Sequence, residues 1–510
     1  MRLKSCAVWF SIVMLALAVA PYSHAIPPFS RQYGTSCSTC HIDFPKLNDF
    51  GKAFKEAGFK FPKGDEDFIK IPPVMLGAPA QKEMFPKVIY PGTIPGIPQI
   101  GLRFNTFFQV YSRNRNSLTP PQPDGTTGAT FTPRTDFQPG LFSIFTAGNF
   151  GDGIAFWVDD DFSVGGANSN GGLGDGYLKF VDIGRLLKLP KDSLSLRVGQ
   201  FEVDLPFSQA RTWNLSGWDI YDEANFGAVG GLGASGVNNV GGVNNAFAFS
   251  SPGQGVELSG GHTYGGYHYS LAVINQNTGG TTAPGSNVSP ATGFTFSDSN
   301  FKDIYGRFQY RFNLEKDAAS RNDIQAAGAT GPRDHTYLQV GTYYFYGRSV
   351  QRIQGESSVL TAREPFYRTG GDFSFNYRTF NLFGLYMYGH DKDSILNAGG
   401  TAFVAGGPAH FNGGFLEADY LALPWLMTIM RYDRVQSTAD FLASNNLNGN
   451  YFQPASATRN RITPGVQFLI HANIKASFEY QIRPPQAFTG GTTAPEQRTN
   501  QAVAGLEWVY

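Results

Sequence analysis

The sequence predicts a mainly β, transmembrane outer-membrane β-barrel of about sixteen strands, preceded by a short N-terminal helical segment. Glycine makes up 61 of 510 residues, aromatic residues 15% and charged residues only 16%. The aromatic content argues against a disordered chain, and the glycine content argues against a helix bundle, because each interior glycine costs a helix roughly 1 kcal/mol. From residue 98 onward, apolar and polar residues alternate with a period of two, which is typical of membrane barrel strands.

The alternation is clearest at the two ends of the predicted barrel, residues 98–510. In the first strand, the apolar face holds Ile100, Leu102, Phe104, Phe108 and Val110, and the polar face holds Gln99, Arg103, Asn105, Gln109 and Tyr111. In the last strand, one face holds Ala502, Ala504, Leu506, Trp508 and Tyr510. Between them we predict strands that start near residues 138, 153, 175, 194, 253, 267, 301, 336, 369, 381, 411, 426, 459 and 473.

Connection lengths support this strand count, because such barrels alternate short periplasmic turns with long outer loops. Tight turns are predicted at Gly151-Asp152-Gly153, Gly265-Gly266, Arg378-Thr379 and near His471. Two inner connections, 184–193 and 314–335, are longer than this pattern requires. The longest outer segment, 206–252, contains a glycine-rich stretch from Gly227 to Gly236 that we interpret as loop, since no strand and helix bracket it. A soluble β-sandwich is the alternative, but its turns would be short at both ends.

Residues 1–25 have the pattern of a cleaved signal peptide. Arg2 and Lys4 precede an apolar run, and Ser23-His24-Ala25 offers small residues at the cleavage position. An uncleaved membrane anchor is the alternative, but the run is shorter than the roughly 20 residues that span a bilayer. The protein is therefore expected to be exported to the bacterial outer membrane and its lipid.

The balance of charge excludes one class of partner. Lys plus Arg and Asp plus Glu each number 40, so no net positive field attracts nucleic acid. Of the three cysteines, Cys6 leaves with the signal peptide, and two are too few for a disulfide scaffold.

The remaining cysteines stand in Cys37-Ser38-Thr39-Cys40-His41, the C-x-x-C-H attachment pattern of c-type haem. In this chemistry both thiols bond to the porphyrin covalently and the adjacent histidine, His41, binds the iron as proximal ligand. A disulfide redox pair would need a βαβ context, and a zinc half-site would need two further Cys or His ligands nearby. The motif therefore predicts one haem c on a monohaem cytochrome c segment, residues 26–61.

A short amphipathic helix is expected after the motif. Leu47, Phe50 and Phe54 recur at helical spacing, with Pro45 suited to the first turn and Gly58 to the C-terminal cap. We expect the porphyrin to be the core that covers the apolar face of this helix. Eight prolines between residues 62 and 98 then predict an extended linker over residues 62–97.

The sequence as a whole resembles the fused monohaem cytochrome-porins. The resemblance rests on Arg31 to His41, Phe44-Pro45, Leu47, Phe50-Gly51, Phe54 and Gly58, and on the strand and loop start Leu196 to Glu202 and Leu205 to Ser208. The best-known members of that family are outer-membrane iron oxidases. The resemblance implies transfer of electrons from extracellular Fe(II) to a periplasmic carrier such as a c-type cytochrome, a ferrous iron:cytochrome c oxidoreductase activity.

The second axial ligand of the iron is less determined by the sequence. Met75 and Met84 are the soft donors of the linker, and a thioether raises the haem potential, so Met75 is the first candidate. His268 and His471 are the rivals, if the haem lies low in the barrel. We expect the haem segment to fold back into the lumen as a plug, with a haem domain hanging in the periplasm as the alternative.

Several charged residues are predicted to face the lumen, most of them as ordinary polar lining. Asp159-Asp160-Asp161 could attract Fe(II), although three aspartates at a strand end are also typical of a solvated rim. Two other functions stay open: outward electron export with partner cytochromes, and a passive porin with a structural haem. The residues predicted to face the lumen are Arg103, Asp159, Asp161, Lys179, Arg307, Arg311, Lys475 and Glu479.

Overall fold

The computed structural model describes the Cys37-to-His41 motif, the barrel strands and part of their connections. The predicted signal peptide, the stretch from Gly227 to Gly236 and most of the long outer loops lie outside the described residues. The described residues are 28–62, 65–87, 92–96, 99–112, 134–151, 153–163, 172–208, 214–222, 252–275, 301–314, 336–354, 359–392, 395–398, 402–405, 409–442, 454–482, 488–489 and 500–510.

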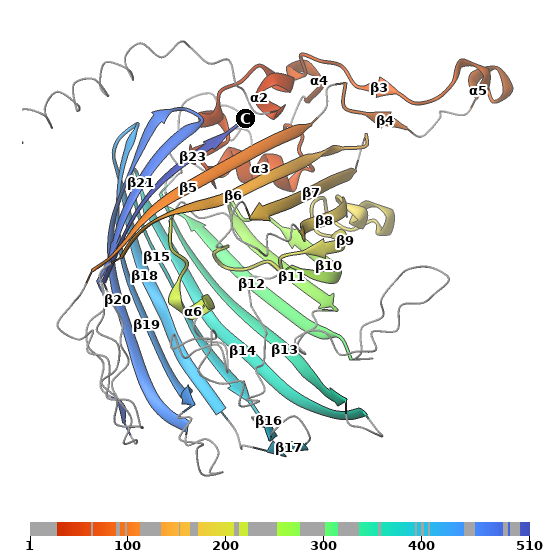
Figure 1. The fold of residues 1–510 in the computed structure, drawn as a ribbon. Coiled ribbons are helices and arrows are strands. Elements are labelled where there is room, and N and C mark those ends of the chain that lie inside the picture. The colour runs from red at the N-terminus through yellow and green to blue at the C-terminus, as the bar shows by residue number, and fades with distance from the viewer. Residues whose placement is uncertain are drawn as a thin grey trace, which may run out of the picture.

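Sixteen antiparallel strands form a closed barrel, which confirms the predicted fold and strand number (Figure 1). Closure comes from the last strand pairing with the first, for example Ala502 with Val110. The strands are β5 (Ile100–Ser112), β6 (Arg134–Asn149), β7 (Ile154–Ser163), β8 (Gly172–Phe180), β9 (Ser195–Phe201), β10 (Gly253–Gly261), β11 (Gly266–Ile274), β12 (Asp303–Asn313), β13 (Tyr337–Gln354), β14 (Val359–Tyr377), β15 (Phe380–Asp391), β18 (Ala409–Leu423), β19 (Leu426–Leu442), β20 (Pro454–His471), β21 (Ile474–Gln481) and β23 (Asn500–Val509).

Further short strands lie near the outer end of the barrel. The two-residue β22 (Phe488–Thr489) pairs with β20. A separate ribbon, β16 (Ile395–Ala398) with β17 (Ala402–Ala405), lies between β15 and β18 in the sequence. Among the described residues, no helix combines the length and apolarity needed to cross a membrane.

The inside and outside of the wall follow the predicted period of two. On β12, Ile304, Phe308 and Phe312 are about half exposed, whereas Arg307 and Arg311 are buried. The exposed apolar side chains face the bilayer and the buried polar ones face the lumen, which is the arrangement of a membrane barrel.

The tight turns lie where the sequence predicts them. β6 and β7 join through Gly151, which has φ +82°, and β14 and β15 join through Arg378-Thr379. The predicted strand starts differ from the observed ones by up to about five residues, except at β14. This strand begins at Val359, ten residues before the predicted 369, and its extension pairs with the end of β13. This extension carries Arg363 and Glu364, so it lacks the regular apolar face on which the prediction rested.

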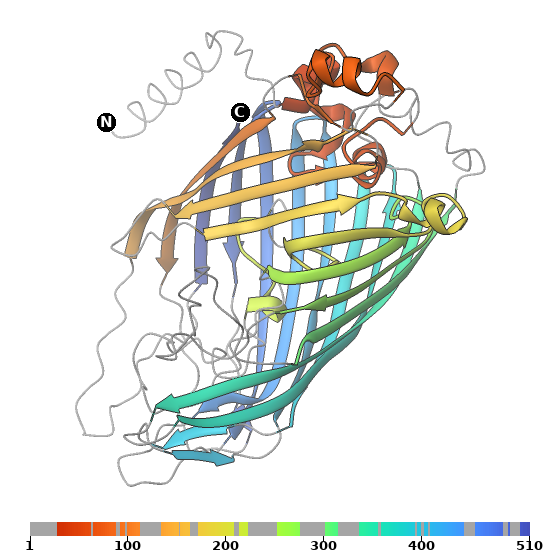
Figure 2. The same cartoon turned by 90° about the vertical axis from the view of Figure 1, so that its right-hand side faces the viewer.

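The N-terminal segment, residues 28–61, lies at the barrel end that also holds the C-terminus of the protein (Figures 1 and 2). The short turns between strands lie at this end, which marks it as periplasmic. The expected plug is thus present in the structure, and no domain hangs below the barrel among residues 28–61. The elements of the N-terminal segment are α2 (Pro28–Tyr33), the 3-10 turn η1 (Cys37–Thr39), β1 (His41–Asp43), β2 (Lys46–Leu47) and α3 (Asp49–Glu56).

Helix α3 begins later than predicted. Pro45 was expected in the first turn, but Asn48 is the N-cap, and its side-chain oxygen accepts from the backbone N–H of Gly51. Residues 46–47 instead pair with β1. The end of the helix is as predicted: Gly58 has φ +77°, and the N–H of Phe59 donates to the Phe54 carbonyl at 2.9 Å. These are features of a Schellman cap.

The apolar face of α3 is covered by protein, so the expectation that the porphyrin is its core was wrong. Phe50, Ala53 and Phe54 are buried against Tyr33 and Phe59. Ala147 and Ala155 of the barrel wall belong to the same cluster. The helix is therefore packed between its own segment and the inside of the barrel.

The linker was predicted to be extended throughout, but it contains two short helices and one short ribbon. The ribbon pairs Val74 with Ile94 and Met75 with Thr93. In Figure 1 the ribbon and the second helix form an arm that reaches sideways beyond the barrel rim. Prolines limit each helix to about one turn. The elements are α4 (Asp65–Phe68), β3 (Val74–Met75), α5 (Pro79–Met84) and β4 (Thr93–Ile94).

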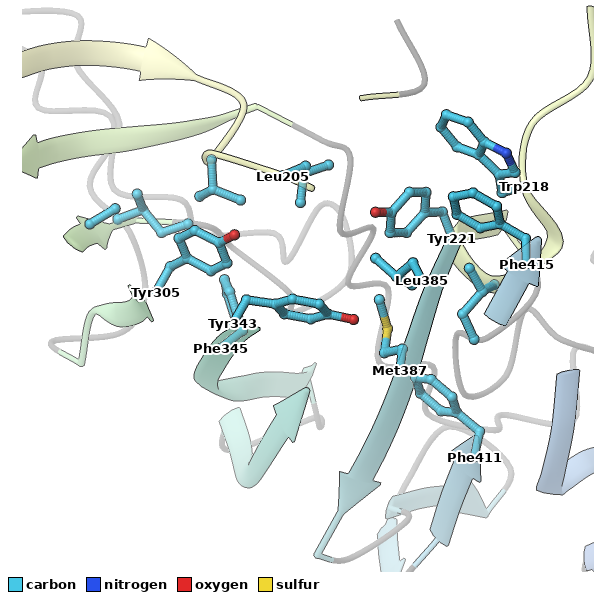
Figure 3. Close-up of a cluster of buried hydrophobic side chains, with 14 of the residues drawn as sticks. Leu205, Trp218, Tyr221, Tyr305, Tyr343, Phe345, Leu385, Met387, Phe411 and Phe415 are labelled. Carbon is cyan, nitrogen blue, oxygen red and sulfur yellow. The ribbon is translucent and has the colours of Figure 1, made fainter. Parts of the chain in front are cut away.

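The segment after β9 folds back into the lumen. Its short helix α6 (Asp219–Asp222) packs on β18 and β19. Trp218 and Tyr221 are buried in an aromatic cluster with Phe415, Tyr305 and Tyr343 (Figure 3). The Trp218 and Phe415 rings stack with their centroids 4.6 Å apart. The interior of the barrel therefore holds a second folded element besides the N-terminal segment.

Candidate haem site

The Cys37-x-x-Cys40-His41 motif forms one tight turn at the periplasmic mouth. The N–H of Cys40 donates to the Cys37 carbonyl at 3.2 Å, so the two cysteines lie at either end of a single 3-10 turn. Both are free thiols, and both are partly buried. His41 follows directly, at the start of β1.

Asn48 ties this turn to helix α3. Its side-chain amide donates to the carbonyls of Ser38 and Thr39 at 3.2 and 3.0 Å, and its backbone N–H donates to the Cys40 carbonyl at 2.9 Å. Because the oxygen of the same amide group caps α3, one buried asparagine connects the motif to the helix.

Gly51 allows the close approach of helix and motif. A Cβ atom built at this position would lie 2.1 Å from the Cys40 carbonyl oxygen, far inside van der Waals contact. A side chain here would force the helix away from the cysteine turn.

The protonation states of the motif suit haem attachment. Burial raises the pKa of the Cys37 thiol and raises the pKa of Cys40 to about 12, so both are neutral thiols at physiological pH. Burial lowers the pKa of His41 to about 4, so its imidazole is neutral and keeps a lone pair for a metal. The His41 Nδ1 atom is buried with no hydrogen-bond partner. An imidazole with an unused nitrogen beside two neutral thiols fits a covalently attached haem.

A buried ion pair fastens the segment to the barrel. Arg311 of β12 donates from both terminal nitrogens to the Asp49 carboxylate, at 2.6 and 2.7 Å. The Arg311 side chain is fully buried and its guanidinium carbon lies 3.5 Å from the centre of the Tyr337 ring. Burial by itself would raise the pKa of Asp49, but Lys52 and Arg311 outweigh it and hold the pKa below its usual range.

Two lysines join the β1–β2 hairpin to other parts of the wall. Lys46 donates to Asn381 of β15 at 2.9 Å and lies 3.5 Å from the Asp419 carboxylate of β18. Lys475 of β21 donates to the Phe44 carbonyl at 2.9 Å.

A third set of contacts lies at the end of α3. Glu56 accepts from the backbone N–H of Thr263 at 2.9 Å and lies 3.3 Å from His262, both in the β10–β11 turn. Burial would raise the pKa of Glu56, yet the hydrogen bonds from His262 and Thr263 and the nearby His268 lower it. Contacts on β12, β15, β18, β21 and this turn hold the segment from several sides, as a plug.

The candidate distal ligands lie in different places. Met75 is 56% exposed on β3, on the arm outside the mouth, and Met84 on α5 is more exposed still. His268 is buried, with Nε2 3.0 Å from the Asp204 carboxylate, and His471 lies 2.6 Å from Asn473 at the β20–β21 turn. Among the described residues, no hydrogen bond, ion pair or ring contact joins any of these four residues to His41, so the distal ligand stays a prediction.

The lumen-facing charges predicted from the sequence mostly form ion pairs and hydrogen bonds. Arg307 pairs with Asp372, Arg103 with Glu507, and Glu479 accepts from Ser216 of the folded-in segment. Asp159 accepts from the indole N–H of Trp157, and the Asp161 side chain lies outside the described residues. Among the described residues there is no group of three or more side chains that could hold a metal ion. Because the Asp161 side chain is not among them, the hypothesis that Asp159-Asp160-Asp161 attracts Fe(II) stays a prediction.

Sequence reasoning missed the residues that place the motif. Asn48 could have been recognised as an N-cap, since it precedes an acidic first turn and an amphipathic run. The partnership of Asp49 with Arg311 has no such signal, because the two residues are 262 positions apart.

Comparisons with known proteins find outer-membrane channels of low sequence identity. No protein-family model matches the sequence, and no curated protein matches it. The outer membrane channel DcaP of Acinetobacter baumannii is 10% identical over 81% of this protein and 96% of its own length, with a TM-score of 0.43. OmpF of Salmonella typhi in complex with daunomycin is 10% identical over 83% and 99%, with a TM-score of 0.43. OprB of Pseudomonas putida is 11% identical over 81% and 94%, with a TM-score of 0.41.

The architecture of the barrel itself gives the class of protein. A closed antiparallel barrel with an even strand number, an apolar exterior and a polar lumen is built to cross a bilayer by strands alone. The protein is therefore a β-barrel of the bacterial outer membrane.

Proposed function

We propose that the protein is an outer-membrane c-type cytochrome that carries electrons from extracellular Fe(II) to a periplasmic carrier such as a c-type cytochrome. The observation that carries this proposal is the single C-x-x-C-H motif of the sequence, seated inside the periplasmic mouth of a barrel that crosses the membrane. A redox group at that position would have the lumen on one side and the periplasm on the other.

Some residues would bind the haem, and others position the motif that carries it. Cys37 and Cys40 would bind it covalently, His41 would supply the proximal nitrogen, and Met75 is the candidate for the distal position. The haem supplies an iron that takes up and releases one electron. Asn48 fixes the motif on α3, and Arg311 fixes α3 in the barrel.

The two folded segments inside the barrel favour passage of electrons over passage of solutes. Residues 28–61 occupy one mouth, and the segment around Trp218 lies inside the barrel, where the Trp218 indole donates to Glu417 at 2.8 Å. Oxidised iron precipitates near neutral pH, so moving only the electron keeps mineral out of the periplasm. A barrel that holds folded segments in its lumen suits that task.

The test uses the haem-loaded protein in sealed liposomes with its outer loops exposed and oxidised cytochrome c trapped inside. We expect external Fe(II) to reduce the trapped cytochrome while the iron content of the liposome interior stays at background. His41→Ala should stop this reduction without preventing barrel insertion. His390→Ala, on β15 outside the plug, is the matched control and should keep the rate of the parent protein.

Two other results would give the protein a different function. Free conduction of small ions in a planar bilayer, with no response to Fe(II), would make it a passive porin with a structural haem. Reduction of external acceptors from inside, with no response to external Fe(II), would make it an electron exporter.

A further inference from the structure

The connection between β8 and β9 is longer than a barrel turn requires, and it exposes a leucine-rich stretch. It contains the 3-10 turn η2 (Ile183–Leu187), and every residue from 185 to 191 is exposed. Leu186 is 85% exposed, Leu187 66% and Leu189 44%. Figure 2 shows this coil standing out from the barrel wall beyond the ends of β8 and β9. Large apolar side chains so exposed, side by side, are typical of a surface that meets another apolar phase.

The exposure is built into the fold. Leu189 donates its N–H to the Gly184 carbonyl at 2.9 Å, and Lys188, with φ +59°, donates to the Arg185 carbonyl at 3.1 Å. The Asp182 carboxylate accepts from the N–H of Asp192 at 2.8 Å and closes the base of the turn. These bonds hold the leucines outward in one conformation.

The leucines continue the lipid-facing surface of the two strands that carry them. Leu178 of β8 and Val198 of β9 lie on the outer face of the wall, 40% and 39% exposed. The turn is at the periplasmic end, which is the side of the barrel that meets the inner leaflet of the outer membrane. The hydrocarbon of the lipid tails is the nearest apolar phase that could cover them.

Cations are interleaved with the leucines. The exposed stretch reads Arg185, Leu186, Leu187, Lys188, Leu189, Pro190, Lys191, with three basic side chains and no acidic one. At its base, Asp182 lies 3.6 Å from Arg185, and Asp192 lies 3.5 Å from His262. Apolar side chains beside Lys and Arg are the pattern of interfacial binding to anionic lipid.

We propose that residues 185–191 form a foot that binds the inner leaflet of the outer membrane, with its leucines among acyl chains and its basic side chains on phospholipid phosphates. The extra length of this turn would then anchor the periplasmic rim of the barrel to the membrane at the ends of β8 and β9. The proposal does not depend on haem or on electron transfer.

The leucine half is tested with Leu186→Trp in the full-length protein, reconstituted in vesicles of phosphatidylcholine and phosphatidylglycerol brominated near the top of the acyl chains. The difference from the parent protein isolates the new tryptophan. We expect a blue-shifted emission that the brominated lipid quenches. Glu66→Trp, on the exposed helix α4 of the linker, is the matched control and should emit as in water.

Two outcomes overturn the proposal. Emission from position 186 like that of the Glu66→Trp control would mean that the turn stands in water. Blue-shifted emission without lipid quenching, together with a dimer in sedimentation, would mean that a second copy of the protein covers the leucines.

The basic half is tested by the enrichment of phosphatidylglycerol around the purified barrel in mixed vesicles. One basic side chain near a membrane surface contributes on the order of fivefold in affinity, so Lys188→Gln should lower the enrichment by about that factor. Lys87→Gln, an exposed lysine of the arm, is the control. Equal enrichment in parent, test and control proteins would contradict the charge assignment.

Discussion

Replacing Arg311 by Gln should release the N-terminal plug from the barrel without unfolding the barrel itself. The Arg311 side chain is fully buried and makes two hydrogen bonds to Asp49, whose side chain is 6% exposed. Removing one partner of a buried ion pair costs about 3–5 kcal/mol, because the other charge stays buried and uncompensated. Asp49 keeps Lys52 at 3.1 Å, so we expect the lower end of this range.

A loss of about 3 kcal/mol corresponds to on the order of a hundredfold shift toward the undocked plug. The assay is hydrogen–deuterium exchange of the backbone amides of α3, residues 49–56, in detergent-solubilised protein. Exchange of these amides should accelerate by about that factor, while the amides of β13 and β14 should be unchanged. The plug would then open as a unit separate from the barrel.

The control is Arg307→Gln, on the same strand and the same face. Arg307 is equally buried and also bonds a carboxylate twice, but its partner is Asp372 of the barrel. If Arg307→Gln accelerates exchange in α3 as much as Arg311→Gln, the effect is a general loosening of the lumen. If neither variant changes α3, the ion pair does not hold the plug, and the reasoning is refuted.

Three further predictions concern the N-terminal plug and the linker that follows it. Asn48→Asp keeps an N-cap acceptor but loses the two donors to Ser38 and Thr39, so it should lower the amount of covalent haem on stained denaturing gels. Asn48→Ala should in addition destabilise α3 by about 1 kcal/mol, measured by amide exchange. Equal haem in the parent protein and the Asp variant would contradict the role of these donors. The pKa values of Asp49 and Glu56 are depressed in the folded protein, so their contribution to docking is present above about pH 4 and is lost as the pH falls through the lower folded values. On acidification, amide exchange in α3 should therefore accelerate before exchange in the strands does. Simultaneous loss of protection in α3 and in the strands would count against a separate plug. If Met75 is the distal ligand, Met75→Ala should abolish the near-infrared thioether-to-iron band and lower the haem potential; an unchanged spectrum would move the assignment to Met84, His268 or His471.

The local patterns of the sequence determined the architecture of the wall. A strand shows one face to lipid and the other to the lumen, so its period of two can be read within ten residues, as in β12 and β23. Tight turns need residues that accept positive φ, and glycines at Gly151 and Gly153 mark one of them. The motif of Cys37, Cys40 and His41 is equally local, because the proposed haem attachment needs all three residues on one turn. These features do not depend on what lies across the barrel.

Contacts between distant segments were decided only by the tertiary structure. Asp49 meets Arg311, and Trp218 meets Glu417, across 262 and 199 positions of the sequence. A charged lumen residue looks the same in the sequence whether it faces water, a plug or a folded-in loop. The apolar face of α3 predicted burial, but the choice between a porphyrin and the Ala147 and Ala155 surface depended on where the plug docks. Burial is a sum over neighbours in space, and local periodicity carries no information about which neighbours those are.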